Sequence, residues 1–349
     1  MRSLPALPET PAVSYVMPVL NEEGYLERAV RTILAQDYAG EKEIVLALGP
    51  SRDRSSDIAR GLAAEDARVR LVDNPERHIP IGLNRAIEAS SHPVVIRVDA
   101  HSELTTDYTR AGIAALRAHD AVNVGGVMRA AGRKPVQRAI ARGYNSPFGL
   151  GGGAYHGDGT AGPAESAYLG IFRRAAIEAV GGYDPGILRG EDWELNLRIR
   201  RAGGTVWFDP ALGVTYWPRG SFRDLSRQFL ATGTWRAVLV RRYRGANPWR
   251  FFAPGALVVA LAASAGVGAL QLIGVLPRRS PWSLLHLASA GYAAGIGFAV
   301  TRLSDPPQRG PRDRALSGAA LITMHVSWGA GFLRGILFGG GRTVDTSRA

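Results

Sequence analysis

An aspartate and a histidine follow an apolar run whose residue types are typical of a buried strand. The run covers residues 94–98, and Asp99 and His101 come directly after it. A carboxylate and an imidazole at this spacing offer oxygen and nitrogen ligands to one divalent cation. Ligands of open α/β sheets bind at the carboxyl ends of strands, where these side chains would lie. The spacing therefore predicts a cation site for a diphosphate. The alternative is that Asp99 caps the next turn and His101 is a solvated loop residue.

The first hundred residues alternate between apolar runs typical of strands and amphipathic patterns typical of helices. Strands are expected over 13–19, 43–48, 69–72 and 94–98. Helices are expected after Asn21-Glu22-Glu23, with an apolar face of Leu26, Val30, Ile33 and Leu34, from about Ser55, and over 81–89. This alternation indicates βαβ units and a mostly parallel sheet, as in one half of a doubly wound nucleotide-binding fold.

The next hundred residues continue with mixed strand and helix patterns. Strands are expected over 121–128, 167–172 and 206–208, and helices over 105–119, 174–180 and 191–201. A long glycine-rich loop is expected over 149–162. A basic and aromatic segment from Trp217 to Trp249 follows, and it fits a helix lying in an anionic membrane surface or an amphipathic helix packed on the domain.

Three apolar runs without Asp, Glu, Lys or Arg fill most of the last hundred residues. They cover 252–276, 282–300 and 316–333. Each is long enough to cross a hydrocarbon core of about 30 Å, and their alanines and glycines suit close helix packing in lipid. The alternative is a set of buried helices in a soluble domain. The chain has 349 residues, which leaves room for one large globular domain before these runs.

The formal net charge of +12 comes largely from arginines beside the apolar runs. Arg241, Arg242, Arg244 and Arg250 precede the first run, and Arg302, Arg309, Arg312 and Arg314 lie between the second and third. The other flanks carry fewer: Arg278 and Arg279, then Arg342 and Arg348. By the positive-inside bias, the N-terminal domain is expected in the cytoplasm and the C-terminus outside. This placement of charge argues against a nucleic-acid partner.

The absence of cysteine excludes disulfides and thiolate metal sites. The first dozen residues are rich in proline and lack the apolar core of a signal peptide. The N-terminal domain is therefore expected to stay on the side of the membrane where it is made.

Taken together, the motifs resemble those of family 2 glycosyltransferases of the GT-A fold, over about residues 13–236. Within that family, the chain is most similar to bacterial exopolysaccharide transferases of the succinoglycan type. The resemblance rests on PVLNEE at 18–23, Asn84, the Asp-Ala-His triplet, GGYDP at 181–185, GEDWELNLRIRRAGG at 190–204, and YWPRGS at 216–221 followed by Gln228 and Trp235-Arg236.

The resemblance implies roles for individual residues. Asp99 and His101 would hold Mn²⁺ or Mg²⁺ against the diphosphate of a nucleotide-sugar, with the imidazole favouring Mn²⁺. Asp192 would be the base that deprotonates an acceptor hydroxyl in an inverting transfer. Glu191 would help to position the acceptor or the metal. A purely structural interpretation is that both acids favour the start of a helix.

Further residues are implied as nucleotide or acceptor contacts. Pro18, Leu20, Asn21 and Glu22 would wrap the nucleotide, with Asn84 and Asp99 nearby, although Asn21 also suits a helix cap. Arg219, Gln228, Trp235 and Arg236 would contact the acceptor or the diphosphate. His156 lies in the glycine-rich run, which is either a mobile loop or a lid over the sugar.

One departure from the family concerns the nucleotide base. Many members carry an Asp-Asp-Gly-Ser turn after the second strand, whereas this chain has Leu48-Gly49-Pro50-Ser51-Arg52-Asp53. A UDP-sugar is the expected donor, but the acid that would identify uracil is missing.

The expected organisation is a flexible N-terminus (1–12), a GT-A domain (13–216), a basic membrane-interface segment (217–251), three transmembrane helices (252–338) and a tail (339–349). The expected function is transfer of a sugar to a polyprenyl-linked saccharide at the cytoplasmic face of the plasma membrane, in polysaccharide or glycoconjugate biosynthesis. Two alternatives are a polyprenyl-phosphate glycosyltransferase and a non-catalytic membrane binding protein with a degenerate transferase fold.

Overall fold

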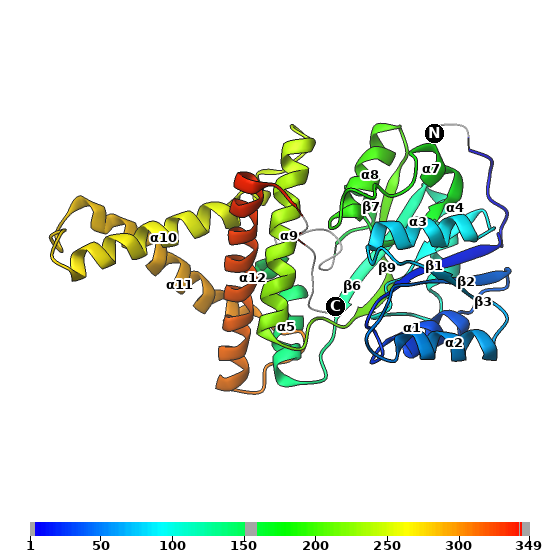
Figure 1. Ribbon diagram of the computed structural model, residues 1–349, viewed down its shortest axis with the longest axis horizontal. Helices are drawn as coiled ribbons and strands as arrows, with labels where there is room; N and C mark the ends of the chain where they lie inside the picture. Colours follow the sequence, from blue (N-terminus) through cyan, green and yellow to red (C-terminus); the bar gives the residue numbers. More distant parts are fainter. Residues whose placement is uncertain (1–3, 151–158, 342, 344–349) are drawn as a thin grey trace. The chain divides into compact units, whose positions relative to one another are not determined.

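A computed structural model describes residues 4–150, 159–341 and 343 of the chain. These residues form two compact units (Figure 1). The first unit takes residues 4–130 and 159–217, and the second takes residues 131–150 and 218–343. Each unit has its own architecture.

The first unit is built on one mixed β-sheet. Its strand order is β3-β2-β1-β4-β8-β6-β9-β5, and β7 pairs with β9. The strands are β1 (Val13–Val19), β2 (Lys42–Leu48), β3 (Val69–Asp73), β4 (Val94–Arg97), β5 (Ser102–Leu104), β6 (Asn123–Ala130), β7 (Gly162–Pro163), β8 (Tyr168–Arg173) and β9 (Val206–Tyr216). The four strands β3, β2, β1 and β4 are parallel, as the βαβ pattern predicts.

The second half of the sheet departs from the parallel arrangement. Strand β8 lies between β4 and β6 and runs antiparallel to both. Strand β9 is longer than expected, because the register between β6 and β9 shifts at Gly125/Val127 and lets the strand continue beyond Pro210. A bulge of this kind accommodates extra residues without ending the ladder. The α/β fold class is confirmed, with a mixed rather than a mostly parallel sheet.

Helices cover both faces of the sheet because strand residues alternate between two apolar faces. One core contains Val13, Tyr15 and Met17 of β1, and residues from α1 (Leu26–Leu34), α2 (Ser55–Glu65) and α4 (Tyr108–Ala118) pack on it. The opposite core contains Val16, Val45 and Ala47, and residues from α3 (Ile79–Ala89), α7 (Arg174–Ala179) and α8 (Glu191–Arg201) pack on it. This three-layer arrangement fixes the carboxyl ends of the central strands.

The second unit is helical. It contains α5 (Pro135–Tyr144), α6 (Pro147–Leu150), α9 (Phe222–Arg242), η2 (Trp249–Phe251), α10 (Ala253–Leu272), η3 (Pro281–Leu285), α11 (His286–Arg302) and α12 (Pro311–Phe338). Three helical segments of this unit, 253–272, 281–302 and 311–338, are long and apolar enough to cross a membrane.

The apolar side chains of α10 and α11 are mostly not covered by protein. Only 17% of the most apolar window of α10 and 6% of that of the 281–302 segment is buried. Leu272, Leu287 and Phe298 are 84%, 67% and 54% exposed. Exposed apolar surface on this scale disfavours the alternative of buried helices in a soluble domain and indicates association with a membrane.

Helix α5 belongs with the C-terminal helices, whereas the change of unit after Trp217 lies one residue from the predicted boundary at 216. The side chain of Arg142 is fully buried and donates hydrogen bonds to Asp313 Oδ2 at 3.0 Å and to Ser317 Oγ at 3.2 Å, both on α12. It also donates to the carbonyl oxygens of Pro306 and Pro307. A buried guanidinium requires such partners, and α12 supplies them, so residues 131–150 belong with the C-terminal helices.

Glycines allow α9 and α12 to approach closely within the helical unit. A Cβ atom at Gly331 would lie 2.0 Å from Leu230 O, and one at Gly335 would lie 2.4 Å from Thr234 O. Gly233 of α9 is equally close to Trp328 O, at 1.9 Å. Gly331 and Gly335 form the small-xxx-small spacing that brings helix backbones together.

We expect Gly331→Ala to destabilise the helical unit by about 1–3 kcal/mol, because the added methyl group has no room against α9. The matched control is Gly297→Ala on α11, where nothing lies within 4 Å of the new Cβ. Thermal unfolding of the full chain in detergent micelles would measure both. Equal stability of the two variants would contradict the close approach of α9 and α12.

Candidate active site

Three acidic side chains of the first unit share one buried guanidinium. Arg97 is the last residue of β4, and its side chain is 4% exposed. Its Nε and Nη2 atoms lie 3.1 Å from Asp99 Oδ1, and Nη2 lies 3.1 Å from Glu191 Oε1. Its Nη1 donates to Asp192 Oδ1. The structure thus brings the predicted metal ligand Asp99 and the predicted base Asp192 onto one side chain.

The fold gathers these acids from distant parts of the chain. Asp99 follows β4, whereas Glu191 and Asp192 begin α8. Gly190 caps α8 with a φ of 81°, a left-handed conformation that favours glycine. This sharp entry places two acids in the first turn of the helix, where the helix dipole stabilises negative charge.

Exposure distinguishes Asp192 from Glu191. The Asp192 side chain is 30% exposed, whereas the Glu191 side chain is only 7% exposed. Burial raises the pKa of Asp192 to about 8; Glu191 and Asp99 add to the shift, and Arg97 opposes it. A general base works best when its pKa is near the working pH. Asp192 therefore has both the access and the basicity that deprotonation of a substrate requires.

The charges around Arg97 hold Asp99 ionised. Burial opposes ionisation of Asp99, but Arg97 and His101 outweigh it and lower the pKa of this carboxyl below its usual range. Burial likewise opposes the charge of Arg97, yet Asp192, Asp99 and Glu191 raise its pKa well above the ordinary value. Asp99 therefore remains a charged oxygen donor that a cation can approach.

His101 is oriented by an acid from the end of β1. Its Nδ1 lies 3.0 Å from Glu22 Oε1, and its ring contacts Tyr216 edge-on at 5.3 Å between centroids. In the tautomer that donates Nδ1–H to Glu22, the Nε2 atom carries the lone pair. A carboxylate that orients an imidazole in this way is a common arrangement behind metal-binding histidines. Glu22, predicted as a nucleotide contact, is thus placed behind a predicted metal ligand.

The residues fit a divalent cation that is shared with a substrate. Among the residues that the structure describes, no group of three or more His, Cys, Asp and Glu side chains is arranged to hold a metal ion. Asp99 and His101 supply an oxygen and a nitrogen donor. Mg²⁺ and similar ions commonly complete such a partial set with water and substrate phosphates.

The turn after β1 is closed by the segment that departs from the family pattern. Asn21 N donates to Ser51 Oγ at 3.0 Å, and Glu22 N donates to Ser55 Oγ at 2.7 Å. Glu23 N donates to Asp53 Oδ2 at 3.1 Å. These three amides are therefore hydrogen-bonded within the protein. Asn21 itself has a φ of 54°, and α1 begins only at Leu26.

Asn84 holds a backbone segment rather than pointing to open space. Its Nδ2 donates to Tyr183 O at 2.7 Å, and its Oδ1 accepts from Tyr183 N at 2.9 Å. Both ends of the amide side chain are therefore used in fixing the GGYDP segment. Tyr183 in turn lies next to Arg97, whose guanidinium carbon is 5.9 Å from the ring centroid.

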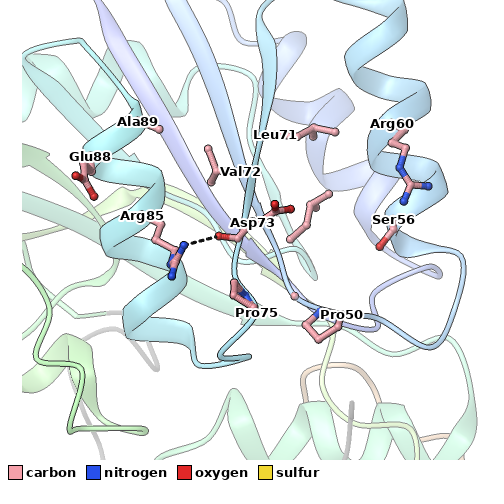
Figure 2. A pocket seen from close by; sticks show the side chains of 12 residues that line it. Pro50, Ser56, Arg60, Leu71, Val72, Asp73, Pro75, Arg85, Glu88 and Ala89 are labelled. Carbon is pink, nitrogen blue, oxygen red and sulfur yellow. Dashed lines mark hydrogen bonds between the residues drawn. The ribbon is translucent and has the colours of Figure 1, made fainter.

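A groove of about 840 Å³ runs along the edge strand β3, between α2 and α3 (Figure 2). Leu48, Gly49 and Pro50 line one end of it, and Arg85 donates to Asp73 O at 3.4 Å beside it. None of the acids around Arg97 lines this groove.

Four further predicted contacts belong to the helical unit. Gln228 is buried and accepts from Tyr144 Oη at 3.1 Å, and Trp235 donates to Thr343 O at 2.6 Å. The guanidinium of Arg236 lies over the ring of Phe251, and Arg219 is buried. Pro18 and Leu20 lie at the end of β1, and His156 falls outside the described residues. Their roles stay predictions.

The mixed α/β sheet and the helices that cover it form a GT-A fold. Among solved structures, the mannosyltransferase PcManGT from Pyrobaculum calidifontis, in complex with GDP-Man and Mn²⁺, has a TM-score of 0.62 and 19% identity over 94% of this chain and 87% of that chain. This similarity concerns the fold.

Sequence comparisons identify the family. The family model described as glycosyl transferase family 2 matches residues 14–181. The succinoglycan biosynthesis protein ExoA of Rhizobium meliloti is 32% identical over 325 residues, which cover 92% of this chain and 94% of that protein. The "Dolichyl N-acetyl-alpha-D-glucosaminyl phosphate 3-beta-D-2,3-diacetamido-2,3-dideoxy-beta-D-glucuronosyltransferase" of Methanococcus voltae is 22% identical over 242 residues, 66% of this chain and 74% of that protein. The chain belongs to glycosyl transferase family 2, as its motifs predict.

Arg97 is the site residue that the sequence analysis missed. The available signal was a charged residue inside an otherwise apolar strand, since such a charge is buried only when it is paired. Two of its three acidic partners, however, lie 94 and 95 residues further along the chain.

We expect Asn84→Ala to lower the free energy of unfolding by about 1–3 kcal/mol, because it leaves Tyr183 N and O without their partner. The affinity of the folded variant for UDP and GDP should fall less than it would if a residue in direct contact with the nucleotide were replaced. Thermal unfolding and isothermal titration calorimetry would measure the two effects. Unchanged stability with strongly weakened nucleotide binding would instead make Asn84 a nucleotide contact.

Proposed function

We propose that this chain is a metal-dependent, inverting glycosyltransferase. It transfers a sugar from a nucleotide-sugar to a hydroxyl group of a lipid-linked saccharide at the cytoplasmic face of the plasma membrane, in polysaccharide biosynthesis. The observation that carries the proposal is the accessible carboxylate of Asp192, which shares Arg97 with Asp99. A base and a cation ligand that contact the same guanidinium suit a reaction in which the acceptor hydroxyl displaces the nucleoside diphosphate in one step.

In the proposed reaction, Asp192 accepts the proton of the acceptor hydroxyl while that oxygen attacks the anomeric carbon. Asp99 and His101 would hold a divalent cation, and the bound cation supplies Lewis-acid stabilisation of the departing diphosphate. Glu22 keeps His101 in its orientation. Attack from the face opposite the leaving group inverts the configuration, so no covalent enzyme intermediate is required.

The charge of the site favours a hydroxyl acceptor over a phosphate acceptor. Asp99, Glu191 and Asp192 surround a single guanidinium. A phosphate acceptor would add its negative charge to that of the donor diphosphate beside these acids. A neutral sugar hydroxyl adds no charge and needs the base that Asp192 offers.

A lipid-linked acceptor is supported by the helical unit and by two relatives. Three helical segments are long and apolar enough to span a membrane, and arginines flank them asymmetrically. ExoA is named for succinoglycan biosynthesis, and the name of the Methanococcus voltae transferase includes a dolichyl-linked sugar phosphate. By the positive-inside bias, the catalytic domain faces the cytoplasm.

A UDP-sugar remains the proposed donor, and GDP-mannose is the donor to test against it. The segment 48–53 lacks the acid expected beside uracil, and Asp53 is engaged by Glu23 N and Ser55. PcManGT, which shares the fold, is in complex with GDP-Man. A panel of both nucleotide classes is therefore the appropriate assay.

We expect Asp192→Asn to reduce sugar transfer by about 10²–10⁴-fold, the usual contribution of a positioned general base. The assay uses the full chain in detergent micelles with Mn²⁺, UDP- and GDP-sugars and a total membrane lipid extract, and it follows nucleotide release and lipid-soluble sugar. The matched control is Asp57→Asn, which removes an exposed acid of α2.

The outcomes separate the alternatives. A small loss in Asp192→Asn would support a polyprenyl-phosphate acceptor, which needs no hydroxyl base. Inactivity of the unmodified chain with every donor would support a non-catalytic binding role.

We expect Glu22→Gln to weaken Mn²⁺ binding by about 10–100-fold, the typical effect of removing a carboxylate behind a metal-binding histidine. Electron paramagnetic resonance of free Mn²⁺, titrated with the full chain, would measure the affinity. Glu27→Gln, in an exposed pair with Arg31, is the matched control. Equal affinity of the two variants would exclude His101 as an oriented ligand.

A further inference from the structure

Arg97 contacts only one oxygen of each aspartate that it binds. Its Nε and Nη2 atoms contact Oδ1 of Asp99, and its Nη1 contacts Oδ1 of Asp192. The planar guanidinium therefore holds each aspartate through its Oδ1 atom. The Oδ2 atoms of Asp99 and Asp192 do not contact Arg97.

The surroundings of Arg97 restrict the movement of its guanidinium group. The side chain is 4% exposed, and its third acid, Glu191, is 7% exposed. The ring of Tyr183 lies 5.9 Å from the guanidinium carbon, and Asn84 holds the backbone of Tyr183 through two hydrogen bonds. The buried Glu191 fixes the position of the guanidinium, and the guanidinium in turn holds the more exposed Asp99 and Asp192.

We propose that Arg97 is a positioning residue that sets Asp192 at a fixed place relative to Asp99, so that the base and the diphosphate side of the site are aligned in one unit. This inference rests on the proposed function, because it assigns Arg97 a role in that reaction. The Oδ2 atom of Asp192 then faces the acceptor hydroxyl, and the Oδ2 atom of Asp99 is available for the cation.

Two features favour positioning over simple charge balance. A lysine would carry the same charge, but its three N–H donors share one nitrogen and cannot reproduce the separate contacts that Arg97 makes through Nε, Nη1 and Nη2. A purely structural ion pair would also have no need to include Asp192, which is 30% exposed and thus accessible to water. Misplacement of a reacting group by about 1 Å costs on the order of 10²-fold in rate.

The test compares Arg97→Lys, Arg97→Gln, Asp192→Asn and the double variant Arg97→Gln/Asp192→Asn in the transfer assay. Both Arg97 variants are expected to lower kcat by about 10–100-fold while KM for the donor changes little, with Lys retaining more activity than Gln. Because Arg97 acts through Asp192, the double variant is expected to be no slower than Asp192→Asn alone. Arg68→Gln, which removes a surface pair with Asp66, is the matched control.

Mn²⁺ binding and thermal unfolding keep the inference testable if a variant is weakly active. Arg97→Gln is expected to bind Mn²⁺ at least as well as the unmodified chain, since a positive charge next to Asp99 is removed. Additive losses in the double variant, or loss of both Mn²⁺ binding and the folded state in Arg97→Lys as well as Arg97→Gln, would overturn the positioning role. If the unmodified chain is active and Asp192→Asn retains full transfer activity, the role of Asp192 as the base is refuted. That result concerns the proposed function and is distinct from the test of Arg97.

Discussion

A guanidinium buried at the end of a central strand is the constraint on which the candidate site depends. Arg97 can stay charged inside the protein only because Asp99, Glu191 and Asp192 surround it. The converse also holds, since three carboxylates would repel one another without a cation between them. The ends of β4 and the start of α8 are therefore tied together by charge as well as by packing. This coupling brings Asp99, the proposed cation ligand, and Asp192, the proposed base, to one guanidinium.

Several residues that resemble ligand contacts instead build the framework of the site. Ser51, Asp53 and Ser55 accept hydrogen bonds from the amides of residues 21–23, and Asn84 holds Tyr183. Buried backbone amides need such partners. The unusual sequence after β2 thus has a structural use, closing the turn from which Glu22 reaches His101.

The helical unit is held by two kinds of interaction that suit an apolar environment. Glycines at 233, 331 and 335 bring the backbones of α9 and α12 together, and Arg142 meets its partners inside the protein. Meanwhile α10 and α11 leave most of their apolar surface uncovered. Close backbone packing inside and apolar side chains outside is the arrangement expected of helices in lipid. It supports the proposal of a membrane-bound transferase.

The sequence by itself determined the features that depend on nearby residues. Periodicity located β1 to β4 and their helices, the length of the apolar runs located the candidate spans, and the order of motifs identified the family. The tertiary structure alone decided that β8 runs antiparallel between β4 and β6, that α5 joins the helical unit, and that Arg97 binds three acids. Those outcomes join Arg97 to Asp192, which are 95 positions apart, and Arg142 to Asp313, which are 171 positions apart. Such pairings depend on complementary charge and packing in the folded chain, which no local pattern of residues records.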